Sequence, residues 1–299
     1  MPSSAYCLEV GEPVPEGIAR IALGRIDHAL DELSGATDSS PEEAVHGARK
    51  DMKKLRALLR LVRGEIGEKA FRRELTVFGD AARELAGVRD ADVMLATLES
   101  LELPASESGP LRQALETHKL QTSAGARGQA SDAAAGMLTA ARERVAGWPL
   151  EGGGFEVFEP GLLRIYRQGR RGFRAAHKDP SAERLHEWRK RVKDLWYHCS
   201  ILEVAWTPVM KAMGDEAHEL SDRLGDDHDL AVLVEWAREH GGAADVSSLE
   251  RAASERRAGL QADAFALGRR LYADRPPAFV ERVGRWWQAA AEQPAEVAS

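Results

Sequence analysis

The chain has 299 residues, of which 43% are hydrophobic and 30% are charged, and this balance excludes a chain that is disordered throughout. Alanine occurs 48 times, against 31 residues of valine, isoleucine and threonine together, which favours an all-α protein. The net charge of −7 would by itself argue against a polyanionic partner.

The sequence shows neither a membrane-spanning segment nor a signal peptide. No uncharged apolar stretch approaches about 18 residues, and residues 1–15 lack a basic segment followed by an apolar one. Cys7 and Cys199 are the only cysteines, which excludes a disulfide framework and a cysteine-rich zinc site. We therefore expect a cytoplasmic protein with no membrane partner.

Eight helices are predicted, four in each half of the chain. They are expected near residues 16–34, 41–64, 68–100, 109–147, 158–177, 181–204, 208–240 and 246–273. A further helix is expected after Pro277. Ser40 and Glu43 predict a capping box at the start of the second helix, and Asp179-Pro180 is expected to start the sixth in a similar way.

Two blocks of the first half recur in the second half. The pattern His-x-x-Arg-Lys-x-x-Lys-x-Leu begins at His46 and again at His186, which is 140 residues later. Residues 85–93 resemble residues 224–232 at an offset of 139. Two matched blocks at nearly the same offset predict a tandem duplication.

The join between the two copies is expected at the turn-rich segment 148–154. The first repeat would then occupy residues 1–150, and the second repeat, with the tail helix, residues 151–299. Four amphipathic helices per repeat predict two four-helix bundles side by side.

Positive charge is concentrated in two segments of this acidic chain. Residues 46–63 carry a net charge of +6 and residues 164–193 a net charge of +8. A protein that is merely soluble mixes its charges, so this distribution indicates a localised anion site.

The repeated helix carries its cations on one face, about 100° wide when each residue turns the helix by about 100°. That stripe contains His46, Arg49, Lys50, Lys53 and Arg60 in the first copy, and His186, Arg189, Lys190, Lys193 and Tyr197 in the second. The opposite face is apolar in both copies. Like charges at this spacing repel each other, whereas arginine, lysine and histidine donors fit phosphate oxygens. The stripe therefore predicts anion binding.

Two other interpretations of the histidines remain open. Glu43-x-x-His46 and Glu183-x-x-His186 resemble the motif of carboxylate-bridged metal pairs in four-helix bundles, although the neighbouring cations would repel a metal ion. An exposed histidine on a bundle is also typical of phosphotransfer modules.

A second motif places a carboxylate beside a donor, at Arg89-Asp90 and at His228-Asp229. The carboxylate either forms an ion pair or orients its neighbour. The carboxylates at Asp90 and Asp92, and at Asp226, Asp227 and Asp229, either pair with basic residues or hold a divalent ion. A polyphosphate or nucleotide phosphohydrolase is a further alternative, but the sequence contains no phosphate-binding glycine loop and no nucleophile motif.

A further basic run precedes the second copy of the motif. It consists of Arg164, Arg167, Arg170, Arg171 and Arg174. The corresponding region of the first half has fewer arginines, Arg20 and Arg25. Nucleic acid is disfavoured as the partner, because no nucleic-acid-binding motif is present and aromatic residues make up only 6% of the chain.

These blocks resemble the CHAD family of α-helical domains, over residues 10–290. The resemblance rests on the motifs that begin at His46 and His186, on Val88-Arg89-Asp90, and on Leu224-Gly-x-x-His228-Asp229. It implies two four-helix bundles related by pseudo-twofold symmetry, with basic residues lining a groove or pore between them. It also implies inorganic polyphosphate as the ligand and no catalytic activity.

We expect no cofactor and no bound metal, with phosphate, sulfate or nucleotides as weak competitors and polyphosphate granules as one place of association. The expected polyphosphate-binding residues are Arg20, His46, Arg49, Lys50, Lys53, Lys54, Arg56, Arg60, Arg89, Arg164, Arg167, Arg170, Arg171, Arg174, His186, Arg189, Lys190, Lys193, Tyr197 and His228.

Overall fold

A computed structural model describes residues 6–85, 90–123, 126–241 and 246–292. The described residues contain eleven α-helices, two short 3-10 helices and no strand, which confirms the all-α prediction. The helices are α1 (Val14–Ser34), α2 (Pro41–Leu61), α3 (Arg63–Glu84), α4 (Asp90–Glu99), α5 (Ala105–Ser123), α6 (Ala126–Val145), α7 (Glu159–Lys178), α8 (Ala182–Ile201), α9 (Thr207–His240), α10 (Ser247–Leu271) and α11 (Pro276–Glu292). Among the described helices, none is both long enough and apolar enough to span a bilayer.

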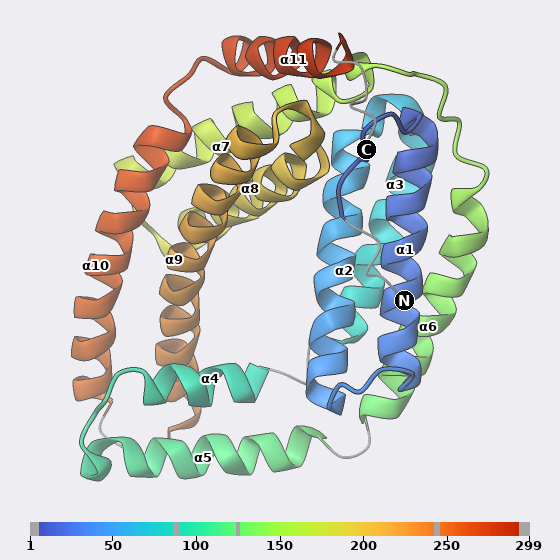
Figure 1. The fold of residues 1–299 in the computed structure, drawn as a ribbon. Helices are drawn as coiled ribbons and strands as arrows, with labels where there is room; N and C mark the ends of the chain where they lie inside the picture. The colour runs from blue at the N-terminus through green and yellow to red at the C-terminus, as the bar shows by residue number, and fades with distance from the viewer. Residues whose placement is uncertain (1–5, 86–89, 124–125, 242–245, 293–299) are drawn as a thin grey trace, which may run out of the picture.

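The first half builds a four-helix group from α1, α2, α3 and α6 (Figure 1). Its interior is filled by fully buried apolar side chains such as Ile18, Met52 and Phe78. The predicted capping box starts α2: the Ser40 N–H donates to Glu43 Oε2 at 2.9 Å, and the Glu43 N–H donates to Ser40 Oγ at 3.3 Å.

The expected helices at 68–100 and 109–147 are each divided, and this prediction was wrong. The first is divided between α3 and α4, and the second between α5 and α6. Helices α4 and α5 leave the first group and pack beside α9 and α10 (Figure 1). There Met94 and Leu115 join Leu233 in a separate apolar core. The periodicity identified the apolar faces, but it could not tell which bundle those faces would meet.

The second half groups α7, α8, α9 and α10 around Trp188, which is fully buried. Here the expected helices agree with the structure to within a few residues, and α9 is continuous over 34 residues. The cap assigned to Asp179-Pro180 was wrong: Asp179 ends α7, while Ser181 caps α8 by accepting a hydrogen bond from the Arg184 N–H.

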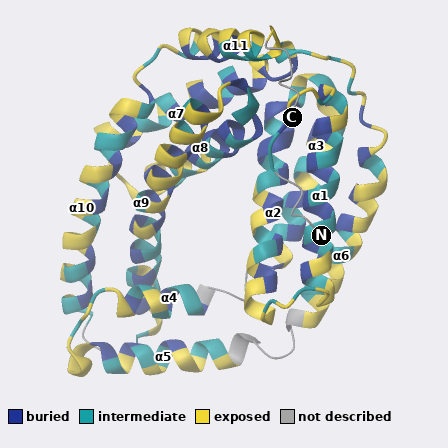
Figure 2. Ribbon diagram, in the orientation of Figure 1, coloured by how far each residue is buried: buried dark blue, intermediate teal, exposed yellow. Residues whose placement is uncertain are grey.

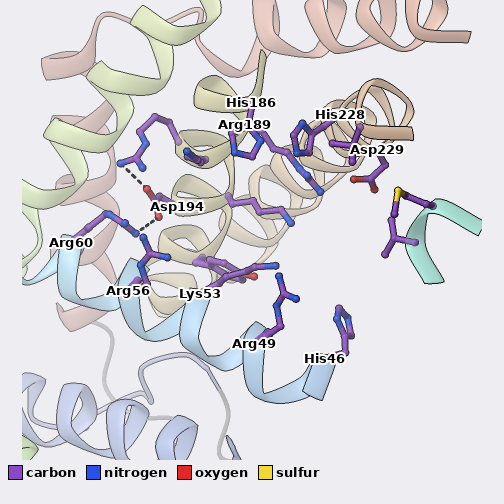
Figure 3. A pocket seen from close by; sticks show the side chains of 17 residues that line it. His46, Arg49, Lys53, Arg56, Arg60, His186, Arg189, Asp194, His228 and Asp229 are labelled. Atoms are coloured by element: carbon purple, nitrogen blue, oxygen red, sulfur yellow. Dashed lines mark hydrogen bonds and ion pairs between the residues drawn. The ribbon is translucent and has the colours of Figure 1, made fainter. Parts of the chain in front are cut away.

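The four-helix group of the first half meets the second half where α2 and α8 pack against each other near their carboxyl ends. Buried residues from both halves belong to one apolar core, and Figure 2 shows them on the inward faces of the helices. At the contact, His198 Nε2 donates to the carbonyl oxygen of Ala57 at 2.9 Å, and Arg60 pairs with Asp194 at 2.9 Å. The amino-terminal parts of α2 and α8 diverge from this contact (Figure 1). A pocket lies between them (Figure 3).

Candidate anion site

The pocket between α2 and α8 has a volume of about 600 Å³ (Figure 3). Helix α9 and the start of α4 complete its wall. The lining residues are His46, Arg49, Lys53, Arg56 and Arg60 of α2; Val93 and Met94 of α4; His186, Arg189, Lys190, Arg191, Lys193, Asp194 and Tyr197 of α8; and His228, Asp229 and Val232 of α9. Among these described residues, eight lysines and arginines face two carboxylates, so the pocket is strongly positive.

The α2 wall is a single row of side chains at intervals of three and four residues. The row runs His46, Arg49, Lys53, Arg56 and Arg60, while the opposite face of α2 is buried. Because i,i+3 and i,i+4 positions share one helix face, the apolar pattern that folds the helix also directs this row into the pocket. Arg49 Nη1 donates to the carbonyl oxygen of Leu85, which caps the end of α3, at 3.2 Å.

The α8 wall carries the second copy of the motif. Arg189 lies against α9 at Gly225, where an added Cβ would stand 2.5 Å from Arg189 Nη2. Glycine at this position therefore makes room for the guanidinium. Burial, together with the charges of Arg189 and Lys53, lowers the pKa of Lys193 to about 7.

Two histidines stack at the α8 wall, His186 from α8 and His228 from α9. Their ring centroids are 4.2 Å apart and the rings are inclined by 33°. Burial, and then the charge of His228, lower the pKa of His186 to about 4. Burial also lowers the pKa of His228. At neutral pH the pair is therefore uncharged in the free protein.

An ion-pair cluster forms the floor of the pocket. Asp194 pairs with Arg60 at 2.9 Å and with Arg191 at 3.0 Å, so the more buried of the two carboxylates is already neutralised (Figure 3). Burial lowers the pKa of Arg56 and of Arg60, and Asp194 opposes that shift.

Three buried nitrogens of the pocket lack a hydrogen-bond partner among the described residues. They are Nε of Arg56, Nε of Arg189 and Nδ1 of His186. A buried donor without an acceptor costs about 1–3 kcal/mol, so an anion with several oxygens would stabilise these side chains.

Several expected binding residues lie outside the pocket. Lys50 is exposed on α2 beyond the lining row. Lys54 lies over the ring of Tyr6 at 5.2 Å, and burial lowers its pKa to about 8. Arg20 is bound to Glu12 at 2.6 Å. The five arginines of α7 are also outside the lining, and Arg89 lies outside the described residues.

The binding residues expected from the sequence did not include Arg191 or Asp194. On a helical wheel Arg191 points well away from the stripe that contains His186. It reaches the pocket because it pairs with Asp194 one turn further along α8. The i,i+3 spacing of these two residues was the available signal.

Three of the carboxylates that could serve a metal site have other partners. Glu43 is used in the cap of α2. Asp92 pairs with Lys119 at 2.5 Å, and Asp227 accepts from Arg257 at 3.0 Å and from Gln261 at 2.7 Å. Within the described part of the chain, no three histidine, cysteine or acidic side chains are grouped as a metal site requires. The side chain of Asp90 lies outside the described residues.

Comparison with known proteins identifies the family and the fold of the chain. The sequence model of the CHAD domain matches residues 20–238. The crystal structure of the CHAD domain from the plant Ricinus communis is similar to this chain, with 19% sequence identity and a TM-score of 0.67. The alignment covers 92% of this chain and 97% of the plant chain, which shows a shared fold. No curated protein matches the chain.

Proposed function

The chain belongs to the CHAD domain family, and on that premise we propose that it binds inorganic polyphosphate in the pocket between α2 and α8. One observation carries the proposal: eight lysines and arginines converge on one pocket with two carboxylates, among the described residues, in a protein whose net charge is −7. A linear polyanion is the ligand chemistry that matches such a row of cations.

The partial burial of these cations gives the pocket its affinity for an anion. Burial makes the charged form of Lys193 costly, and its pKa of about 7 expresses that cost. An anion between Lys53 and Lys193 offsets the mutual repulsion of these side chains, and its oxygens accept hydrogen bonds from the donors that lack partners. Arginine adds forked donors that match phosphate oxygens.

Both walls act on one ligand in this proposal. Arg49 and Arg189 are corresponding residues of the repeated motif, and both line the same pocket. We infer that a tandem duplication, with pseudo-twofold symmetry between its copies, produced the two walls.

The proposed activity is binding without hydrolysis. Within the described lining, Tyr197 supplies the only hydroxyl group, and burial raises its pKa, which keeps it a poor nucleophile. Asp194 is held by two arginines and is therefore poorly placed to act as a general base. Incubation with polyphosphate and Mg²⁺ should release no orthophosphate above the rate measured without protein.

Calorimetric titration with tripolyphosphate at increasing salt tests the binding proposal. The logarithm of the association constant should fall linearly with the logarithm of salt concentration, by about 0.7 for each phosphate charge neutralised, by analogy with single-stranded nucleic acid. A flat response between about 50 and 300 mM salt contradicts the electrostatic mechanism.

A further inference from the structure

The outer face of α7 carries a second row of cations, separate from the pocket. The row runs Arg164, Arg167, Arg171, Arg174 and Lys178, with the same intervals of three, four, three and four residues as the α2 wall. At about 1.5 Å per residue it extends for about 21 Å. The last four side chains are exposed, and Arg164 is half-buried.

These five side chains have no ion pair or hydrogen bond with any described residue. The sequence itself has no carboxylate between Glu159 and Asp179, and Asp179 pairs with Arg184 at 3.1 Å. Like charges at i,i+3 and i,i+4 on a helix are destabilising. The row is thus an uncompensated strip of positive charge on an acidic protein.

The corresponding helix of the first half lacks such a strip. In α1, Arg20 is bound to Glu12 at 2.6 Å, and the buried Arg25 pairs with Asp51 at 3.3 Å. Both cations of α1 are therefore neutralised within the fold. The repeat alone does not require an unpaired row, so the row on α7 needs another explanation.

The α7 row begins close to the floor of the pocket. Gly161 packs against the backbone of Leu61, next to Arg60, and a Cβ at Gly161 would stand only 1.9 Å from the Leu61 carbonyl oxygen. Gln168 accepts a hydrogen bond from Arg191 at 3.3 Å. Since Arg60 and Arg191 are both bound to Asp194, the strip starts beside residues that line the pocket.

We propose that the α7 row is a second anion-binding surface, which holds the part of a long polyphosphate chain that extends beyond the pocket. The inference rests on the proposed function. A single straight row of cations fits a single flexible polyanion whose other end is held nearby. The two surfaces would act as linked sites, because occupation of the pocket raises the local concentration of chain at α7.

Other anionic partners fit this surface less well. The aromatic residues of α7, Tyr166 and Phe173, turn inward, with Tyr166 stacked on Phe279, so bases of a nucleic acid would find no stacking platform. A membrane-binding helix needs an exposed apolar face beside its cations. The apolar face of α7, which includes Leu162 and Ile165, is buried in the fold.

The test compares short and long chains on two matched variants. Arg167→Ala with Arg171→Ala removes two charges from the row, and Arg251→Ala with Arg256→Ala removes two exposed charges from α10. The probes are tripolyphosphate, long-chain polyphosphate and duplex DNA.

The α7 variant should bind long chains at least about fivefold more weakly than the original protein, and the logarithm of its association constant should fall less steeply with the logarithm of salt concentration, by about 1.4. Its affinity for tripolyphosphate should stay within about twofold of that of the original protein. The α10 variant should change neither affinity by more than about twofold. Equal losses in the two variants would mean that only net charge matters, and would overturn the inference.

Two further outcomes would also overturn it. One is an equal loss for tripolyphosphate and for long chains in the α7 variant. The other is a loss that affects duplex DNA alone. If the original protein did not bind tripolyphosphate, that result would contradict the proposed function. The role of α7 is tested separately, by the difference in long-chain affinity between the two variants.

Discussion

The two walls of the pocket carry the same motif, yet their histidines differ in burial. His46 on α2 is exposed, whereas His186 on α8 is half-buried against His228. The difference lies in the neighbouring helix, because α9 continues past the α8 wall, while the chain beside α2 is divided between α3 and α4. The repeated sequence alone therefore does not determine how deeply each side chain is buried, because the helix beside each wall differs.

A second difference lies at corresponding positions 54 and 194. Lys54 turns to the ring of Tyr6, outside the pocket, while Asp194 holds Arg60 and Arg191 at the floor. Asp194 therefore stabilises the contact between α2 and α8, a role that Lys54 lacks.

The largest effect is expected from removing cations of the α8 wall. Charge-assisted hydrogen bonds contribute about 1.5–3 kcal/mol each. Arg189→Ala, Lys190→Ala and Lys193→Ala together should weaken tripolyphosphate binding about a thousandfold, or about 4 kcal/mol. Arg49→Ala with Lys53→Ala removes two cations and should cost about a hundredfold. Calorimetric titration measures both.

Lys50→Ala is the matched control, because Lys50 belongs to the motif but lies outside the lining. Its affinity should change by less than about twofold. A loss as large as that of Arg49→Ala would show that the exposed stripe, and not the pocket, binds the ligand.

The next effect is on stability. Asp194→Ala leaves Arg60 and Arg191 without their carboxylate at the contact of α2 and α8, and we expect the free energy of unfolding to fall by about 3 kcal/mol. Lys54→Ala at the corresponding position should cost about 1 kcal/mol or less. Denaturant unfolding of both variants measures this difference, and equal losses would contradict the supporting role of Asp194.

The affinity should also depend on pH through Lys193. Its pKa is about 7 in the free protein, where Asp222 and Asp229 oppose the lowering effects of burial, Arg189 and Lys53. A bound polyanion raises this pKa, so binding takes up a proton above pH 7, and affinity must fall as pH rises. We expect about a tenfold loss between about pH 7.5 and 9.

Lys193→Arg keeps the charge at every pH in this range and should flatten the profile. Lys53→Arg on the opposite wall is the control, since the dependence assigned to Lys193 should survive it. A profile that Lys193→Arg leaves unchanged would refute the assignment.

The smallest effect separates the two histidines. His186→Ala removes a half-buried ring that contacts His228 and should weaken tripolyphosphate binding about threefold, whereas His46→Ala, at an exposed position, should have no effect beyond about 1.5-fold. Affinities at pH 7.5 measure both changes. The reverse order would indicate that the α2 wall holds the ligand more closely.

The sequence predicted the helical fold, the capped start of α2 and most of the lining row, because each follows from helical spacing or local capping. It could not predict that α4 and α5 pack on the second half, since their apolar faces are equally suited to either bundle. Nor could it separate Lys53, which lines the pocket, from Lys50, which does not, because both belong to one stripe. The role of Arg191 depends on its ion pair with Asp194. Neither residue belongs to the cationic stripe from which the binding residues were predicted.

The claim that two walls hold one ligand is tested most directly by a double-mutant cycle of Arg49→Ala and Arg189→Ala, followed by calorimetric titration with tripolyphosphate. We expect one tripolyphosphate per chain and a coupling energy of about 1 kcal/mol or more between the two positions. Two ligands per chain, or losses that add to within about 0.5 kcal/mol, would contradict a shared site.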